Sequence, residues 1–118
     1  MVWLALLLAT AVEPHFSAAC EALNPVRVVS NDIEPPVLIH RVEPKFVRAN
    51  AVVIVGTIID REGNVCDAQV VKGAGRAANA AAAAAVCLWK FTPMRWHGET
   101  RASVFYVTVN LQTRARGK

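Results

Sequence analysis

A run of alanines at residues 80–85 is the feature that most restricts how this chain can fold. Alanine is the strongest helix former, and a proline soon after the run prevents the helix from continuing. The sequence therefore predicts a helix that begins near residues 76–79 and ends near Lys90, before Pro93. The residues at spacings of three or four along one side of this helix are expected to face a sheet: Ala81, Ala84, Ala85, Leu88 and Phe91.

Three segments with the composition of strands flank that helix. Residues 51–60 are apolar on both faces, as a central strand is, and residues 65–72 resume strand character after a turn that contains Asp60 and Gly63. Residues 101–111 are rich in β-branched and aromatic side chains. Because two strands joined by a tight loop form an antiparallel hairpin, the sequence predicts an α+β fold with the element order β-β-α-β.

The connections restrict the order of these strands. The hairpin pairs the first strand with the second, and the helical crossover returns the third strand beside the first. We therefore expect a three-stranded antiparallel sheet in the order 2-1-3, packed against one helix. The third strand is then an edge of the sheet, and a long apolar edge is a hazard unless another strand is meant to pair with it.

The N-terminal segment has the outline of a secretory signal. Residues 2–12 are almost wholly apolar, and small residues at Ser17-Ala18-Ala19 resemble a cleavage site. We interpret residues 1–19 as a signal peptide or, since no Lys or Arg precedes the apolar run, as a truncated membrane anchor. The run alone is shorter than the roughly 20 residues that span a bilayer. Lipidation of Cys20 is a less favoured alternative.

A proline-rich arm follows at residues 20–48, because each proline fixes its own φ and biases the preceding residue away from helix. A short edge strand is expected in it near residues 37–41. The domain itself is predicted at residues 49–112, and a basic tail at residues 113–118.

Charge and cysteine content exclude some kinds of partner. The net charge of +4 comes from basic residues spread along the chain, so we expect no nucleic-acid partner. The three cysteines contain no C-x-x-C pair, which argues against a zinc site. Cys66 and Cys87 are the pair within the predicted domain and form the candidate disulfide in an oxidising compartment; two buried thiols are an alternative that is at least as favoured.

No set of residues has the spacing of a catalytic site. His15, His40 and His97 lie in the leader, the arm and a loop, without a spaced Cys, Asp or Glu partner. Asp60 and Glu62 share a hairpin loop, where a role in forming the turn is favoured over acid–base chemistry. We expect that the chain is not an enzyme and that it uses no metal and no cofactor.

Several strings, taken together and in order, resemble a known family. They are Pro-Pro-Val-Leu-Ile-His-Arg-Val-Glu-Pro at residues 35–44, Ile59-Asp60 followed by Glu62-Gly63-Asn64-Val65, Trp89-Lys90-Phe91-Thr92-Pro93, and Gly98 ahead of Val107-Thr108-Val109-Asn110. Over residues 35–112 the chain resembles the C-terminal domain of TonB-type energy transducers. The structural motif of this resemblance comprises Gly63, Trp89, Phe91, Pro93 and Gly98.

The resemblance implies a periplasmic domain, with tethering to the inner membrane as one option. Such a domain binds the TonB box, an extended peptide of outer-membrane receptors, by adding it as a strand to the third strand of the sheet. Inner-membrane proton-driven motor proteins supply the force, so the domain couples the proton-motive force to transport. A homodimer is a further option.

The predicted partner-binding residues are Arg101, Ser103, Val104, Phe105, Tyr106, Val107, Thr108, Val109 and Asn110, with Trp96 as a flanking residue. A proline at Phe105 or Val107 is expected to abolish binding by removing a donor of the strand ladder. The sequence shows no long Pro/Lys-rich spacer of the kind that crosses the periplasm. The alternative is therefore an envelope adaptor that dimerises through this strand, or binds peptidoglycan, without transmitting force.

Overall fold

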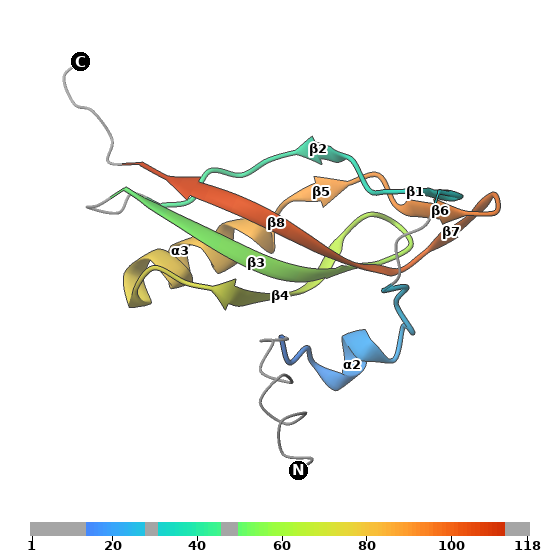
Figure 1. Ribbon diagram of the computed structural model, residues 1–118, viewed down its shortest axis with the longest axis horizontal. Helices are drawn as coiled ribbons and strands as arrows, with labels where there is room; N and C mark the ends of the chain where they lie inside the picture. Colours follow the sequence, from blue (N-terminus) through green and yellow to red (C-terminus); the bar gives the residue numbers. More distant parts are fainter. Residues whose placement is uncertain (1–13, 28–30, 46–49, 113–118) are drawn as a thin grey trace, which may run out of the picture.

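The computed structural model describes residues 14–27, 31–45 and 50–112 (Figure 1). The apolar run of the leader and the basic tail lie outside these residues. The elements in chain order are α2 Ala18–Glu21, β1 Ile33–Glu34, β2 Leu38–His40, β3 Ala51–Ile59, β4 Val65–Lys72, α3 Arg76–Val86, β5 Lys90–Phe91, β6 Met94–Trp96, β7 Glu99–Arg101 and β8 Ser103–Leu111.

Strand β3 is the centre of the main sheet, in which the neighbours are β4-β3-β8 and both pairings are antiparallel. The register between β3 and β8 runs without a shift from Ala51 opposite Leu111 to Ile59 opposite Ser103. The three strands expected around the helix therefore do pair with one another, and β8 is an edge strand of this sheet.

The turn between β3 and β4 is built as its composition predicts. The Asp60 carboxylate accepts hydrogen bonds from the backbone N–H groups of Glu62 and Asn64, both at 2.9 Å. Gly63 has a φ of 87°, a conformation that side chains disfavour. The Gly63 carbonyl accepts a hydrogen bond from the N–H of Phe91 at 2.9 Å, so the turn is also joined to β5.

A bulge interrupts β4 beside this turn. Val65 pairs with Ile59 and Asp67 pairs with Ile58, which leaves Cys66 as the extra residue on β4. An extra residue bends its strand and changes the direction of the local side chain. Cys66 also carries a covalent link to the N-terminal segment.

Helix α3 covers one face of the main sheet but ends earlier than predicted. Its last residue is Val86, not a residue near Lys90. The N–H groups of Leu88 and Trp89 donate to carbonyls three residues earlier, in a tightened last turn. The chain then enters β5, so Pro93 is not what ends the helix.

The buried face of α3 also differs from the predicted face. The buried helix residues are Ala78, Ala82, Ala85 and Val86, whereas Leu88 is 65% exposed. Of the residues expected to face the sheet, Ala85 and Phe91 are buried and Ala84 is exposed. Alanine on every side of a helix gives no period from which its inner face could be identified.

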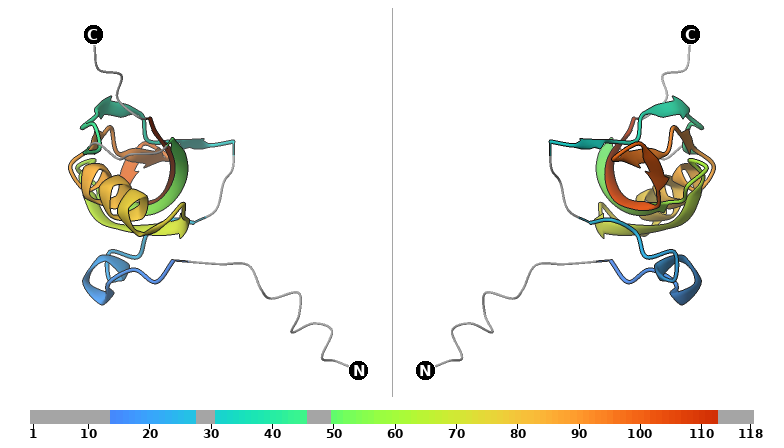
Figure 2. Two further views of the ribbon diagram at one scale, coloured as in Figure 1. Left: turned by 90° about the vertical axis from the view of Figure 1, so that its left-hand side faces the viewer. Right: turned by 90° about the vertical axis from the view of Figure 1, so that its right-hand side faces the viewer.

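The core lies between α3 and the main sheet. Its buried members are Val53, Val55, Ile59, Ala68, Ala78, Ala82, Val86, Trp89, Phe91, Val107, Val109 and Leu111. Figure 2 shows the main sheet curving around α3, with α2 on the opposite side of the sheet.

Two smaller antiparallel sheets complete the fold, one ordered β1-β6-β7 and the other β2-β5. The α+β class is confirmed, but the prediction of a single three-stranded sheet is wrong. The additional strands have two or three residues each, too few to show a period of two in the sequence. Among the described residues, no helix is long and apolar enough to cross a membrane.

Candidate functional site

The outer edge of β8 is the candidate site, and its hydrogen-bonding groups can be assigned from one contact. The N–H of Val104 donates to the carbonyl of Val26 at 2.9 Å, on the side of β8 away from β3. Backbone groups alternate in direction along a strand, and the register with β3 has no shift. The N–H and C=O groups of Tyr106, Thr108 and Asn110 therefore also point away from β3.

The side chains of β8 alternate between the two faces of the sheet. Ser103, Val107, Val109 and Leu111 are buried, whereas Tyr106, Thr108 and Asn110 are exposed. We call the face of the main sheet that points away from α3 the outer face. The residues that present backbone groups at the outer edge of β8 thus carry uncharged polar side chains on this outer face. Within the described ranges, no strand pairs with this part of β8.

The predicted site residues consequently fall into two sets. Val104, Tyr106, Thr108 and Asn110 face the outer edge, whereas the backbone groups of Ser103, Phe105, Val107 and Val109 face β3. Thr57 supports this assignment, since its hydroxyl donates to the Phe105 carbonyl at 2.6 Å. A proline at Phe105 or Val107 would thus remove a donor of the domain's own ladder, so the residues chosen from the sequence for that test are the wrong ones.

Arg101 and Trp96 lie beside the start of β8 rather than on it. Arg101 ends β7, and its guanidinium lies 5.3 Å from the centre of the Trp96 ring. The ring centre of Trp96 also lies 5.1 Å from that of His97. The Nε1 of Trp96 and the hydroxyl of Ser103 are buried with no hydrogen-bond partner among the described residues.

The aromatic residues of the structural motif connect α3, β5 and the proline-rich arm. Trp89 and Phe91 are buried, with ring centres 6.3 Å apart. Trp89 Nε1 donates to the carbonyl of Val42 at 2.8 Å, and the guanidinium of Arg41 lies 5.3 Å from its ring centre. These contacts agree with a core role for both aromatic residues.

The glycines of that motif have different surroundings. Gly63 and Gly98 both have positive φ, and Gly98 forms the two-residue β6–β7 turn with His97. A Cβ at Gly63 would collide with the Phe91 carbonyl oxygen, whereas a Cβ at Gly98 would meet nothing within 4 Å. Pro93 follows β5 and is partly buried.

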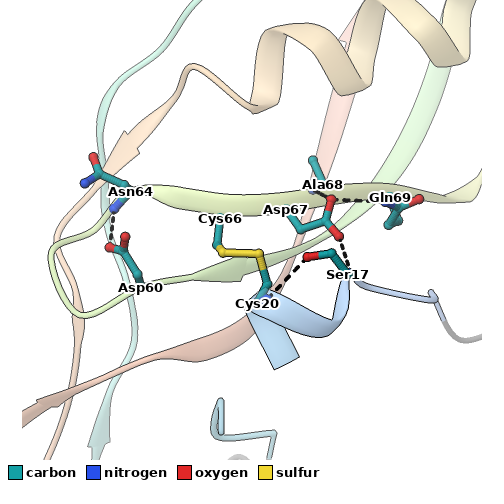
Figure 3. Close-up of a disulfide and its surroundings, with 8 residues drawn as sticks. All are labelled: Ser17, Cys20, Asp60, Asn64, Cys66, Asp67, Ala68 and Gln69. Carbon is teal, nitrogen blue, oxygen red and sulfur yellow. Dashed lines mark hydrogen bonds between the residues drawn. A yellow bond between two sulfur atoms is a disulfide. The ribbon is translucent and has the colours of Figure 1, made fainter. Parts of the chain in front are cut away.

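A disulfide joins the N-terminal segment to the main sheet, and it is not the predicted one. Cys20 in α2 is bonded to Cys66 in the bulge of β4, as Figure 3 shows. Cys87 is the free cysteine of the described residues, so the predicted Cys66–Cys87 pair is wrong. Burial raises the pKa of the Cys87 thiol, and the negative charge of Asp67 raises it further.

Sequence reasoning missed this pair because it places Cys20 in the proline-rich arm, directly after the leader, and counts only Cys66 and Cys87 within the domain. In the structure its sulfur is bonded to Cys66, which leaves no thiol there for a lipid. One available signal was Ser17, a preferred N-cap residue, whose hydroxyl accepts a hydrogen bond from the Cys20 N–H at 3.3 Å.

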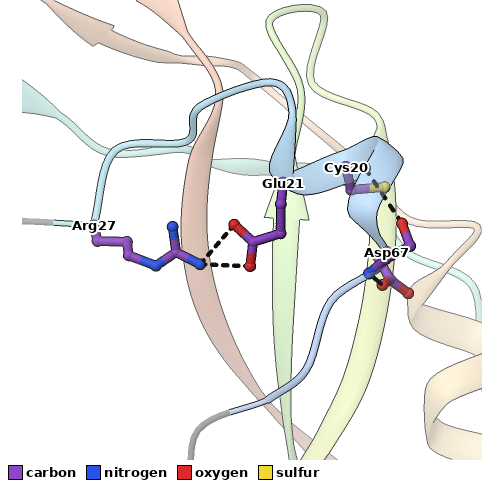
Figure 4. Close-up of polar contacts among 5 residues, drawn as sticks. Cys20, Glu21, Arg27 and Asp67 are labelled. Atoms are coloured by element: carbon purple, nitrogen blue, oxygen red, sulfur yellow. Dashed lines mark hydrogen bonds and ion pairs between the residues drawn. The ribbon is translucent and has the colours of Figure 1, made fainter.

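Val26 is the second residue that sequence reasoning missed. It forms an isolated parallel bridge with Ser103: its N–H donates to the Ala102 carbonyl at 2.9 Å, and its carbonyl accepts from Val104. Figure 4 shows Arg27, the next residue, paired with the Glu21 carboxylate at 2.7 Å. The edge of β8 already accepts one extended residue of its own chain.

The arrangement suits strand pairing. The described residues contain no group of three or more His, Cys, Asp or Glu side chains that could hold a metal ion. The edge instead offers main-chain donors and acceptors beside uncharged side chains, which is what an added strand requires.

Comparison with known proteins agrees with the resemblance seen in the strings of residues 35–112. Residues 47–112, more than half of the chain, match the family described as Gram-negative bacterial TonB protein C-terminal. No curated protein and no solved structure is similar enough to count as a match. The matched segment begins just before β3 and ends just after β8, so it contains the whole main sheet and α3. The chain therefore belongs to the family of Gram-negative bacterial TonB protein C-terminal domains.

Proposed function

We propose that this chain is a periplasmic domain that binds the TonB box of outer-membrane receptors by adding it as a strand to the outer edge of β8. Membership of the TonB C-terminal family supports a role in energy transduction. The observation that carries the proposal is the row of outward backbone groups at Tyr106, Thr108 and Asn110. Through such a strand, a proton-driven motor in the inner membrane would act on the receptor and drive transport.

The chemistry of this edge favours a transient complex. Three outward residues offer about six main-chain hydrogen bonds, each worth roughly 0.5–1.5 kcal/mol net. Association itself costs about 4 kcal/mol or more, so backbone pairing alone leaves at most about 5 kcal/mol, which corresponds to a Kd of about 0.2 mM or weaker. Additional affinity has to come from side-chain contacts on the outer face, where Tyr106 is 49% exposed.

The test is a titration of the protein with a synthetic TonB-box peptide, followed through its backbone amide resonances. We expect the largest shifts at Tyr106, Thr108 and Asn110. Thr108→Pro removes one outward N–H at an exposed position, and prolines are tolerated on edge strands when the N–H faces solvent. This variant should fold and should bind the peptide at least about tenfold more weakly.

Thr108→Ala is the matched control, since it shortens the same side chain and keeps the N–H. It should bind within about threefold of the unsubstituted chain, because surface substitutions cost little. Shifts confined to the β3–β4 turn, with β8 silent, would refute strand addition. Sedimentation without peptide tests the adaptor alternative: a dimer that Thr108→Pro dissociates would assign this edge to a second copy.

A further inference from the structure

The residues ahead of the family-matched segment cross the outer face of the main sheet. We call residues 14–27 the strap. The backbone N–H of Ser17 donates to the Asp67 carboxylate of β4 at 2.7 Å, and Cys20 is bonded to Cys66 (Figure 3). The strap then reaches the opposite edge of the sheet, where Val26 pairs with Ser103 of β8. It is therefore attached to both edge strands, β4 and β8.

The strap has a packing role as well. Ile58 is fully buried, yet it does not belong to the cluster between α3 and the sheet. Side chains alternate along β3, so Ile58 lies on the outer face, where the strap runs. Pro14 lies over the same face, since a Cβ at Gly56 would approach its Cγ to 3.0 Å. Release of the strap would uncover this apolar surface.

Val26 uses two of the backbone groups that an added strand would need. The Ala102 carbonyl and the Val104 N–H belong to the same outward row as the groups of Tyr106 and Thr108, and Val26 occupies both of them at 2.9 Å. A partner strand on β8 cannot form these two hydrogen bonds while the strap is in place.

We propose that the strap, fastened by the Cys20–Cys66 disulfide, acts as an end stop that confines a partner strand to Tyr106–Asn110. The inference rests on the proposed function for its partner, although the contact between strap and edge is measurable without one. The strap sets where the added strand ends and so limits the length of receptor peptide that is read. Release of the strap would open Ala102 and Val104 as well.

The first measurement uses the full chain without peptide and follows hydrogen exchange of two amides of β8. The Val104 N–H is covered by Val26, whereas the Thr108 N–H has no partner among the described residues, so Val104 should exchange more slowly. Cys20→Ser/Cys66→Ser frees the strap. Val26→Pro keeps the disulfide but removes the donor to Ala102, one of the two hydrogen bonds that hold the Val26 carbonyl over the Val104 N–H. In both variants, Val104 exchange should accelerate about tenfold, towards the rate of Thr108. Cys87→Ser is the control and should leave it unchanged.

The second measurement maps a synthetic TonB-box peptide of about ten residues, long enough to span β8 when extended. In the unsubstituted chain the shifts should stop at Tyr106. In the two released variants they should extend to Val104, and the Kd should fall about tenfold, the worth of two main-chain hydrogen bonds.

Three results would each contradict a different part of the proposal. If the exchange rate of the Val104 amide stays unchanged in both variants, the disulfide and Val26 do not hold the strap on the edge of β8. A peptide that shifts Val104 in the unsubstituted chain refutes the end stop but leaves strand addition intact. Accelerated Val104 exchange without any peptide shift on β8 refutes the proposed function and the footprint, while the strap contact stands.

Discussion

Two glycines with the same sign of φ illustrate how surroundings decide the cost of a side chain. Gly63 lies in the β3–β4 turn with its Cα against β5, and Gly98 lies in the open turn of the β6–β7 hairpin. Both need a left-handed backbone, which costs a residue with a Cβ roughly 1–2 kcal/mol. Only at Gly63 does the added methyl also meet backbone.

Gly63→Ala should therefore destabilise the domain by roughly 3–4 kcal/mol, since positive φ and a collision with the Phe91 carbonyl add together. Gly98→Ala should cost only about 1–2 kcal/mol. Urea unfolding followed by circular dichroism measures both. Equal losses in the two variants would show that the contact with β5 is unimportant.

Cys87 permits a second residue-level test. Because burial and the Asp67 charge raise its pKa, less thiolate is present at a given pH than in a free cysteine. Iodoacetamide should label the folded, unreduced chain at Cys87 alone. The labelling rate should rise at a higher pH than for a cysteine peptide, as mass spectrometry after digestion can show. Labelling at Cys20 would contradict the observed disulfide.

At the level of elements, the turn after α3 depends on Trp89 because it joins the helix to the proline-rich arm. Trp89→Phe keeps an aromatic ring but leaves the Val42 carbonyl without its donor and weakens the contact with Arg41. We expect a loss of about 1–3 kcal/mol in the free energy of unfolding.

Trp96→Phe is the comparison, since the Trp96 Nε1 is buried without a partner in the described part of the chain. Removing that donor should cost less than about 1 kcal/mol. Chemical denaturation of both variants, with the exchange rate of amides near Val42 as a local readout, tests the difference. A larger loss for Trp96→Phe would show that Trp96 is the more important anchor.

The elements also show what sequence reasoning could reach. β3, β4 and β8 were predictable because each is long and has a clear composition, and their connection placed β8 at an edge. The direction of each N–H on β8 was not predictable, since it depends on the register. The contact of Val104 with Val26 shows which N–H groups of β8 point away from β3, so the informative proline lies at Thr108 and not at Phe105 or Val107.

Other features were out of reach for physical reasons. The four-residue helix α2 and the strands β1, β2, β5, β6 and β7 are too short for periodicity to show. The disulfide could not be deduced, because three cysteines allow several pairs and the bulge that exposes Cys66 to the strap exists only in the folded sheet.

For the whole molecule, that disulfide closes a loop between positions 46 residues apart. Loop-closure entropy for this separation corresponds to roughly 4 kcal/mol, and measured effects are often smaller. Cys20→Ser/Cys66→Ser should therefore lower the free energy of unfolding by about 2–4 kcal/mol in urea titrations. Cys87→Ser should change it by less than about 1 kcal/mol. An unchanged midpoint in the double variant would show that the strap folds independently of the sheet.

Because the strap packs on the main sheet, the part of the chain that folds together is longer than the segment that matches the family. Family similarity starts at residue 47, but the cover over Ile58 and Gly56 comes from residues 14–27. A fragment trimmed to the similar residues would keep every strand of the main sheet and still present its outer apolar face to water. Such surfaces promote self-association. Dimers seen with a fragment of that kind would report a missing segment rather than the behaviour of the intact chain.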